Sequence, residues 1–166
     1  ALNLGIRLNA VERLRELFVK AHQLKLGDEI DLLAEEAKAA AAVGQMDHAE
    51  ALWRSIRKKT REGDETHLRA TKSLGKLLIE KGAPRAALNL YEQTLKRLPR
   101  NHWMRAEILD HVVNVHRQNG SLASLLKDIP RLARGFEAKL CRARILEELG
   151  RPDEAIGLYE KLTSKY

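Results

Sequence analysis

The chain has 166 residues, of which 44% are hydrophobic and 32% are charged, a balance that excludes a disordered polymer and fits a folded protein. Aromatic residues make up only 4%, and the abundance of Ala, Leu, Lys, Arg and Glu favours helices. No apolar run approaches the roughly 20 residues of a membrane-spanning helix, and the single cysteine, Cys141, excludes an internal disulfide framework.

The net charge of +7 is unevenly distributed along the chain. Residues 1–50 hold 6 basic and 9 acidic residues, residues 51–107 hold 14 and 6, and residues 108–166 hold 10 and 8. The basic middle suggests an acidic partner, a nucleic acid or another anionic surface. A solvated helix exterior would give the same composition, so charge alone leaves the partner open.

Apolar residues at three- and four-residue spacing predict amphipathic helices along the whole chain. In chain order these helices are expected at about 8–26, 29–43, 48–62, 64–81, 84–98, 102–119 and 121–128, then in two segments divided by Gly150. Asp28 and Asp47 are expected to cap the second and third helices. Pro130 is expected to end the seventh helix early, because proline removes a helical hydrogen bond and clashes with the preceding turn.

The turns recur in a regular way. Gly44, Gly82 and Gly150 are each followed five residues later by alanine and four residues further by an aromatic residue, in the segments GQMDHAEALW, GAPRAALNLY and GRPDEAIGLY. A helix–turn–helix unit that repeats along a sequence indicates an α-solenoid.

The segment from Thr71 to Pro99 resembles a tetratricopeptide repeat (TPR), with matching residues at Leu74-Gly75, Leu78, Ala87, Tyr91 and Pro99. Thr71 and Leu78 stand where the family prefers aromatic residues. The units around Gly44 and Gly150 match in part, and the unit around Gly120 matches least. The resemblance implies an all-α fold, a right-handed α-solenoid of TPR-like repeats with about nine helices.

We therefore expect one helical-repeat domain over residues 1–166, with a leading helix at 1–27 and repeat units at 28–63, 64–101, 102–134 and 135–166. The chain starts with Ala1 and no polar capping helix follows the last repeat. We expect a fragment of a longer protein, with uncapped ends that favour self-association. Cytoplasm and periplasm both remain open as its compartment.

Gly75 interrupts a strong helical pattern, where glycine costs roughly 1 kcal/mol relative to alanine. In the TPR family, the small residue here lets the second helix of the hairpin approach closely. Gly75 is therefore predicted to face Ala87 and Tyr91, so that packing offsets the lost helix propensity.

No pattern of catalytic or metal-binding residues is present in the sequence. The histidines lack metalloprotease spacing, the glycines lie singly at helix ends, and adjacent carboxylates point to different helix faces. We expect no enzyme, no metal and no cofactor. Trp53 and Cys141 are expected to be packing residues, and Trp103 is expected to wedge against the preceding hairpin.

The resemblance implies that the first helix of each hairpin lines a concave groove. On the helix expected at 64–81, a basic face is formed by Arg69, Lys72 and Lys76. The predicted partner-binding residues are Lys38, Arg69, Lys72, Lys76, Asn114, Arg117 and Arg144. The predicted function is a protein-interaction scaffold that binds an acidic peptide or protein segment in this groove.

Two alternatives stay open at this point. A nucleic-acid-binding repeat is permitted by the pI of about 9.7 but is disfavoured by the lack of interleaved aromatic residues in the groove. A structural spacer in a larger assembly, such as a bacterial envelope or secretion complex, is the other. The dense basic run at 54–62 is expected to be a solvated outer surface.

Overall fold

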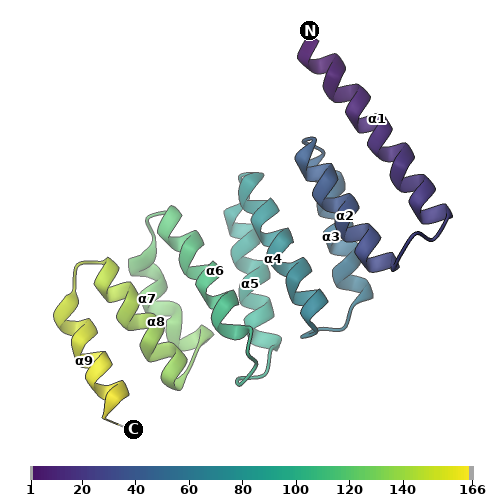
Figure 1. Cartoon of the computed structure of the whole chain (residues 1–166). Coiled ribbons are helices and arrows are strands. Elements are labelled where there is room, and N and C mark those ends of the chain that lie inside the picture. The colour runs from purple at the N-terminus through teal and green to yellow at the C-terminus, as the bar shows by residue number, and fades with distance from the viewer. Residues whose placement is uncertain (1, 165–166) are drawn as a thin grey trace. The chain divides into compact units, whose positions relative to one another are not determined.

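A computed structural model describes the backbone of residues 2–164 and side chains from Asn9 onwards. Over these residues the chain forms nine α-helices and no strand (Figure 1). The helices are α1 (Leu2–Gln23), α2 (Glu29–Ala42), α3 (Met46–Lys59), α4 (Glu65–Glu80), α5 (Pro84–Arg97), α6 (Arg105–Gln118), α7 (Leu122–Leu132), α8 (Gly135–Glu148) and α9 (Pro152–Thr163). The predicted all-α architecture is confirmed.

The helices form two compact units that divide within α5. The first unit extends to Ala87, and within it α1 packs on α2, α2 on α3 and α3 on α4. The second unit begins at Leu88, and within it α6 packs on α7, α7 on α8 and α8 on α9. A single repeat domain over the whole chain remains a prediction.

The first helix of each hairpin ends in the same way, and Gly82 illustrates it. Gly82 has a φ of 76°, in the left-handed region that favours glycine. The N–H of Ala83 then reaches back to the carbonyl of Leu78 at 2.8 Å, which satisfies a carbonyl that the end of α4 would leave unpaired. Equivalent bonds follow Gly44, Gly120 and Gly150, so the sequence repeat corresponds to a repeated helix end.

Small residues allow the helices of the first unit to pack closely. Ala37 and Ala40 of α2 and Ala49 of α3 are each 0% exposed. Gly75 and Ala87 are both buried, as the predicted close approach requires. The contact of Gly75 with Ala87 and Tyr91 itself stays a prediction.

In the second unit, α8 and α9 share a core of Ala143, Leu146 and Ala155. Leu158 and Tyr159 pack against this core from α9. On the same helix Ile156 remains 53% exposed. Self-association through this end of the chain stays a prediction.

One of the two predicted caps is confirmed. The side chain of Asp28 accepts a hydrogen bond from the N–H of Ile30 at 2.8 Å and caps α2. The predicted Asp47 cap is wrong, because α3 begins at Met46 and Asp47 lies in its first turn. Asp47 instead forms an ion pair with Lys81, whose Nζ lies 2.6 Å from Oδ1.

The predicted early end of the seventh helix is also wrong. The helix α7 continues through Pro130 to Leu132. Pro130 lies in the last turn, so its missing N–H removes a bond where the helix is about to end. Continuing the helix buries Ile129 and Leu132, which are 0% and 6% exposed, and this burial outweighs the proline penalty.

Candidate partner-binding surfaces

The predicted basic face lies on α4 in the first unit. Arg69 and Lys76 are exposed and Lys72 is half-buried. Lys76 Nζ lies 3.9 Å from Glu80 Oε1, the pairing that the spacing of four residues favours. Among the residues that the structure describes, no carboxylate pairs with Arg69.

A hollow of about 160 Å³ lies beside this face, between α2, α3 and α4. It brings together two of the predicted binding residues, Lys38 of α2 and Arg69 of α4. Asp31 and Glu35 also line it, and Lys38 Nζ pairs with Glu35 Oε1 at 2.5 Å. The hollow is therefore mixed in charge, and the positive excess lies along α4.

The predicted residues of the second unit lie on α6 and α8, where carboxylates already pair with them. Arg117 donates two hydrogen bonds to Glu148, at 2.6 and 2.5 Å, and another to Asn114 Oδ1. Hydrogen bonding to Arg117 holds the pKa of Glu148 below its usual value. Arg144 Nη1 likewise lies 3.2 Å from Asp110 Oδ1. Asn114, Arg117 and Arg144 therefore form part of an ion-pair network between two helices.

Several cations of the basic run at 54–62 are already paired within the chain, so the run is less available to a ligand than its composition suggests. Arg54 pairs with Glu50 at 2.8 Å, and Lys59 pairs with Glu29. Arg57 Nε donates to the hydroxyl of Thr71 at 2.9 Å. The remaining cations of the run, Lys58 and Arg61, are exposed.

Sequence reasoning missed the central polar residue of the second unit, Arg105. This side chain is 6% exposed. Its guanidinium donates to the carbonyls of Leu95 at 2.6 Å, Leu98 at 3.3 Å and Leu132 at 2.7 Å, and Nε donates to Glu137 Oε2 at 3.3 Å. It thereby joins the C-terminal ends of α5 and α7 to the first turn of α8. No sequence signal marks Arg105, because its partners are carbonyls distant in the chain.

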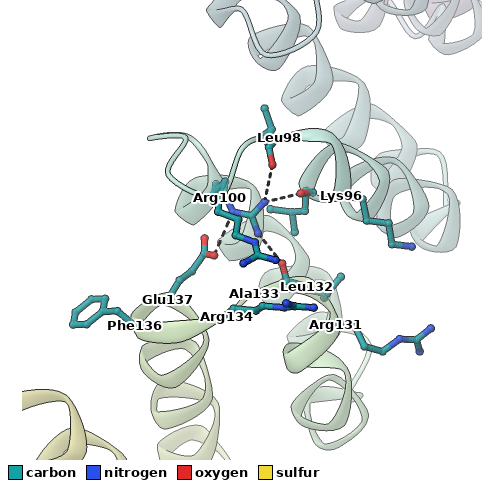
Figure 2. A pocket seen from close by; sticks show the side chains of 11 residues that line it. Lys96, Leu98, Arg100, Arg131, Leu132, Ala133, Arg134, Phe136 and Glu137 are labelled. Atoms are coloured by element: carbon teal, nitrogen blue, oxygen red, sulfur yellow. Dashed lines mark hydrogen bonds and ion pairs between the residues drawn. The ribbon is translucent and has the colours of Figure 1, made fainter.

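Arg105 also lines a hollow of about 490 Å³, and basic side chains dominate the polar lining of this hollow. In the view of Figure 2, Arg100 and Arg134 lie in the middle of the lining side chains, with Lys96 and Arg131 to one side and Phe136 to the other. Arg131 Nη1 lies 3.4 Å from Asp128 Oδ1.

The predicted wedge role of Trp103 is wrong. Trp103 is 68% exposed and stacks on His102, with ring centroids 6.0 Å apart. The next residue, Met104, is 2% exposed and takes the core position at the start of α6. Because adjacent residues point in different directions, burying Met104 turns Trp103 outward. Trp53 is 6% exposed, consistent with the predicted packing role.

Potential metal ligands and a thiol are also present in the described part of the chain. No group of three or more His, Cys, Asp or Glu residues there is placed to hold a metal ion. Cys141 is 8% exposed, and burial raises the pKa of its thiol to about 11, which makes it a poor nucleophile at neutral pH. His22 and His48 both contact Glu36, at 3.0 and 2.9 Å.

None of the helices that the structure describes combines the length and apolar character needed to cross a membrane.

Comparison with known proteins agrees with the repeat architecture. Residues 143–165 match the family model described as Tetratricopeptide repeat. Two solved structures are similar to the chain, both of a protein from Podosopora anserina provisionally described as a kinesin light chain with nearly identical TPR-like repeats. One of them, a form of that protein with a single substitution, has a TM-score of 0.56 and 20% identity, and covers 98% of this chain and 87% of its own. The form without that substitution has a TM-score of 0.56 and 21% identity, and covers 98% and 88%. No curated protein matches this chain.

The chain is therefore a TPR-like helical-repeat protein in its fold. Helical-repeat arrays of this kind form extended concave surfaces that are used for binding.

Proposed function

We propose that this chain is a protein-interaction scaffold, not an enzyme, and that it binds an acidic peptide or protein segment along the groove face of α4. The observation that carries the proposal is the row of Arg69, Lys72 and Lys76, with Arg69 at the edge of the hollow between α2 and α4. Carboxylates of a bound segment would relieve the repulsion within this row.

The same residues set the expected strength of binding. Exposed ion pairs contribute only about 0.2–1 kcal/mol each. We therefore expect modest affinity that weakens as salt is added, because screening acts strongly on exposed charges. The paired cations of the second unit, Arg117 and Arg144, are expected to contribute less, since an acidic ligand must compete with Glu148 and Asp110 for them.

The test uses the whole chain and a labelled peptide of alternating Glu and Ser, followed by fluorescence anisotropy. The double variant Lys72→Glu with Lys76→Glu should weaken binding at least about tenfold, which corresponds to about 1.4 kcal/mol. Circular dichroism should show an unchanged helical fold, because both positions are at least partly exposed.

A matched control carries the same charge change in the same unit. Lys58→Glu with Arg61→Glu alters two exposed cations of the outer basic run. Under the proposal this control binds the peptide nearly as well as the parent. If the control loses binding and the α4 variant keeps it, the outer run is the site and the groove assignment is wrong.

A further inference from the structure

The second unit contains a surface that the groove proposal does not use. The hollow of about 490 Å³ adjoins another of about 270 Å³, and both are lined by Arg100, Arg105, Phe136 and Glu137. Because the buried guanidinium of Arg105 bonds to α5, α7 and α8, the segments that line the two hollows are held in fixed relative positions. The surface is therefore part of the folded unit.

The larger hollow carries an excess of positive charge. Its basic lining residues are Lys96, Arg100, Arg105, Arg131 and Arg134, and its acidic residue is Glu137. Glu137 already accepts a hydrogen bond from Arg105. Within residues 9–164, no carboxylate pairs with Lys96, Arg100 or Arg134. A ligand that brings carboxylates relieves this repulsion, and guanidinium groups bind carboxylates in bidentate geometry.

The smaller hollow combines polar side chains with a group of apolar ones. Trp103 and Phe136 are 68% and 55% exposed, and aliphatic side chains of α6 and α8 line the same hollow, namely Ala106, Leu109 and Leu140. Exposed apolar side chains that gather in one place with polar residues around them mark interaction sites more often than single exposed ones do. Exposed aromatic residues beside arginines are the combination enriched at the energetic centres of protein interfaces.

We propose that these two hollows bind a protein segment in which a large apolar side chain lies next to two or more carboxylates. The apolar side chain contacts Trp103 and Phe136, and the carboxylates contact Arg100 and Arg134. The surface lies entirely in the second unit, so this proposal can be tested independently of the proposal for the groove face of α4.

A nucleic acid fits this surface less well. Asp110 and Glu137 line the smaller hollow and would repel a continuous phosphate backbone, whereas a peptide can place its few carboxylates away from them. Trp103 already stacks on His102 with an interplanar angle of 19°, which leaves one face of its ring for a base.

The experiment uses a short synthetic peptide with one Phe followed by a run of Glu. Two control peptides replace the Phe with Ser or the Glu residues with Gln. In a Trp53→Phe background, Trp103 is the sole tryptophan of the chain, so its fluorescence reports this surface alone. We expect a saturable blue shift with the first peptide and at least about thirtyfold weaker binding of both controls.

Protein variants then locate the site. Arg100→Glu with Arg134→Glu should weaken binding at least about thirtyfold. The matched control, Lys127→Glu with Lys161→Glu, makes the same charge change at exposed positions outside both hollows and should bind within about threefold of the parent. Lys72→Glu with Lys76→Glu should leave the Trp103 signal unchanged, even if the groove proposal is correct.

Three outcomes would overturn the proposal. The first is equal binding of all three peptides or binding of none. The second is full binding by the Arg100 and Arg134 double variant. The third is an oligothymidylate that binds tighter than the peptide and displaces it, since this would assign the surface to single-stranded nucleic acid.

Discussion

The two units bury polar side chains in different ways. The first unit buries the neutral side chains of His67 and Thr71, which are 5% and 0% exposed, and the half-buried Arg57 reaches Thr71 from their edge. The second buries the charged guanidinium of Arg105 against three carbonyls and one carboxylate. A buried charge needs more partners than a neutral group does, because its desolvation costs more. The stability of the second unit should therefore depend on one side chain to a degree that the first does not.

Removing that side chain should have the largest effect. Arg105→Met keeps the apolar stem but leaves three carbonyls and Glu137 without their buried donor. We expect a loss of about 3–5 kcal/mol in the free energy of unfolding, measured by urea denaturation. Arg100→Met is the control, because Arg100 lines the same hollow but is exposed. A loss below about 1 kcal/mol for Arg105→Met would show that water replaces the guanidinium at little cost.

The two units also differ in the space around a glycine within one of their helices. Gly75 of α4 is buried, so Gly75→Leu should overpack the first unit and cost about 1–3 kcal/mol. A Cβ added at Gly157 of α9 would have open space around it. No heavy atom lies within 4 Å of it, apart from its chain neighbours and the nearby backbone of its own helix. Gly157→Ala should therefore stabilise the second unit by about 0.5–1 kcal/mol. An unchanged melting temperature for Gly75→Leu would refute the predicted close approach.

The stability of the first unit should depend on pH through the buried His67. Burial, and then the charge of Arg57, lower the pKa of His67 below its usual 6.5. The unfolded chain therefore takes up the proton at a higher pH than the folded chain does, and stability falls as pH drops below about 6.5. The slope for one group is at most about 1.4 kcal/mol per pH unit. His67→Gln should flatten the stability curve between about pH 7 and 5, and an unchanged slope would contradict the assignment.

The exposed ion pairs of α6 and α8 should have the smallest effect. The side chains of Arg144 and Asp110 are 53% and 52% exposed. A double-mutant cycle with Arg144→Ala and Asp110→Ala should give a coupling energy of about 0.2–1 kcal/mol. A coupling above about 2 kcal/mol would mean that this surface contributes to stability as the buried Arg105 does.

Local chemistry was enough to predict the helices and most of their ends. Helical spacing of apolar residues, Asp28 at a helix start and glycines at helix ends each act within a few residues of chain, so the sequence displays them directly. Thr71 marks the limit of such prediction, because it departs from the family pattern at a core position. In the structure its hydroxyl donates to the carbonyl of His67 at 2.9 Å and accepts from Arg57 at 2.9 Å, partners that the pattern alone could not supply.

The residue pattern was sufficient to predict an all-helical repeat, the positions of its turns and the basic row on α4, because all three depend on periodicity and composition. Only the packing of the folded chain fixes which charges are available to a ligand. It pairs Arg117 and Arg144 with carboxylates 31 and 34 residues away, buries Arg105 against distant carbonyls, and leaves Trp103 exposed beside a hollow lined by arginines. Pairing and burial are relations between segments far apart in the chain, and packing alone brings those segments together.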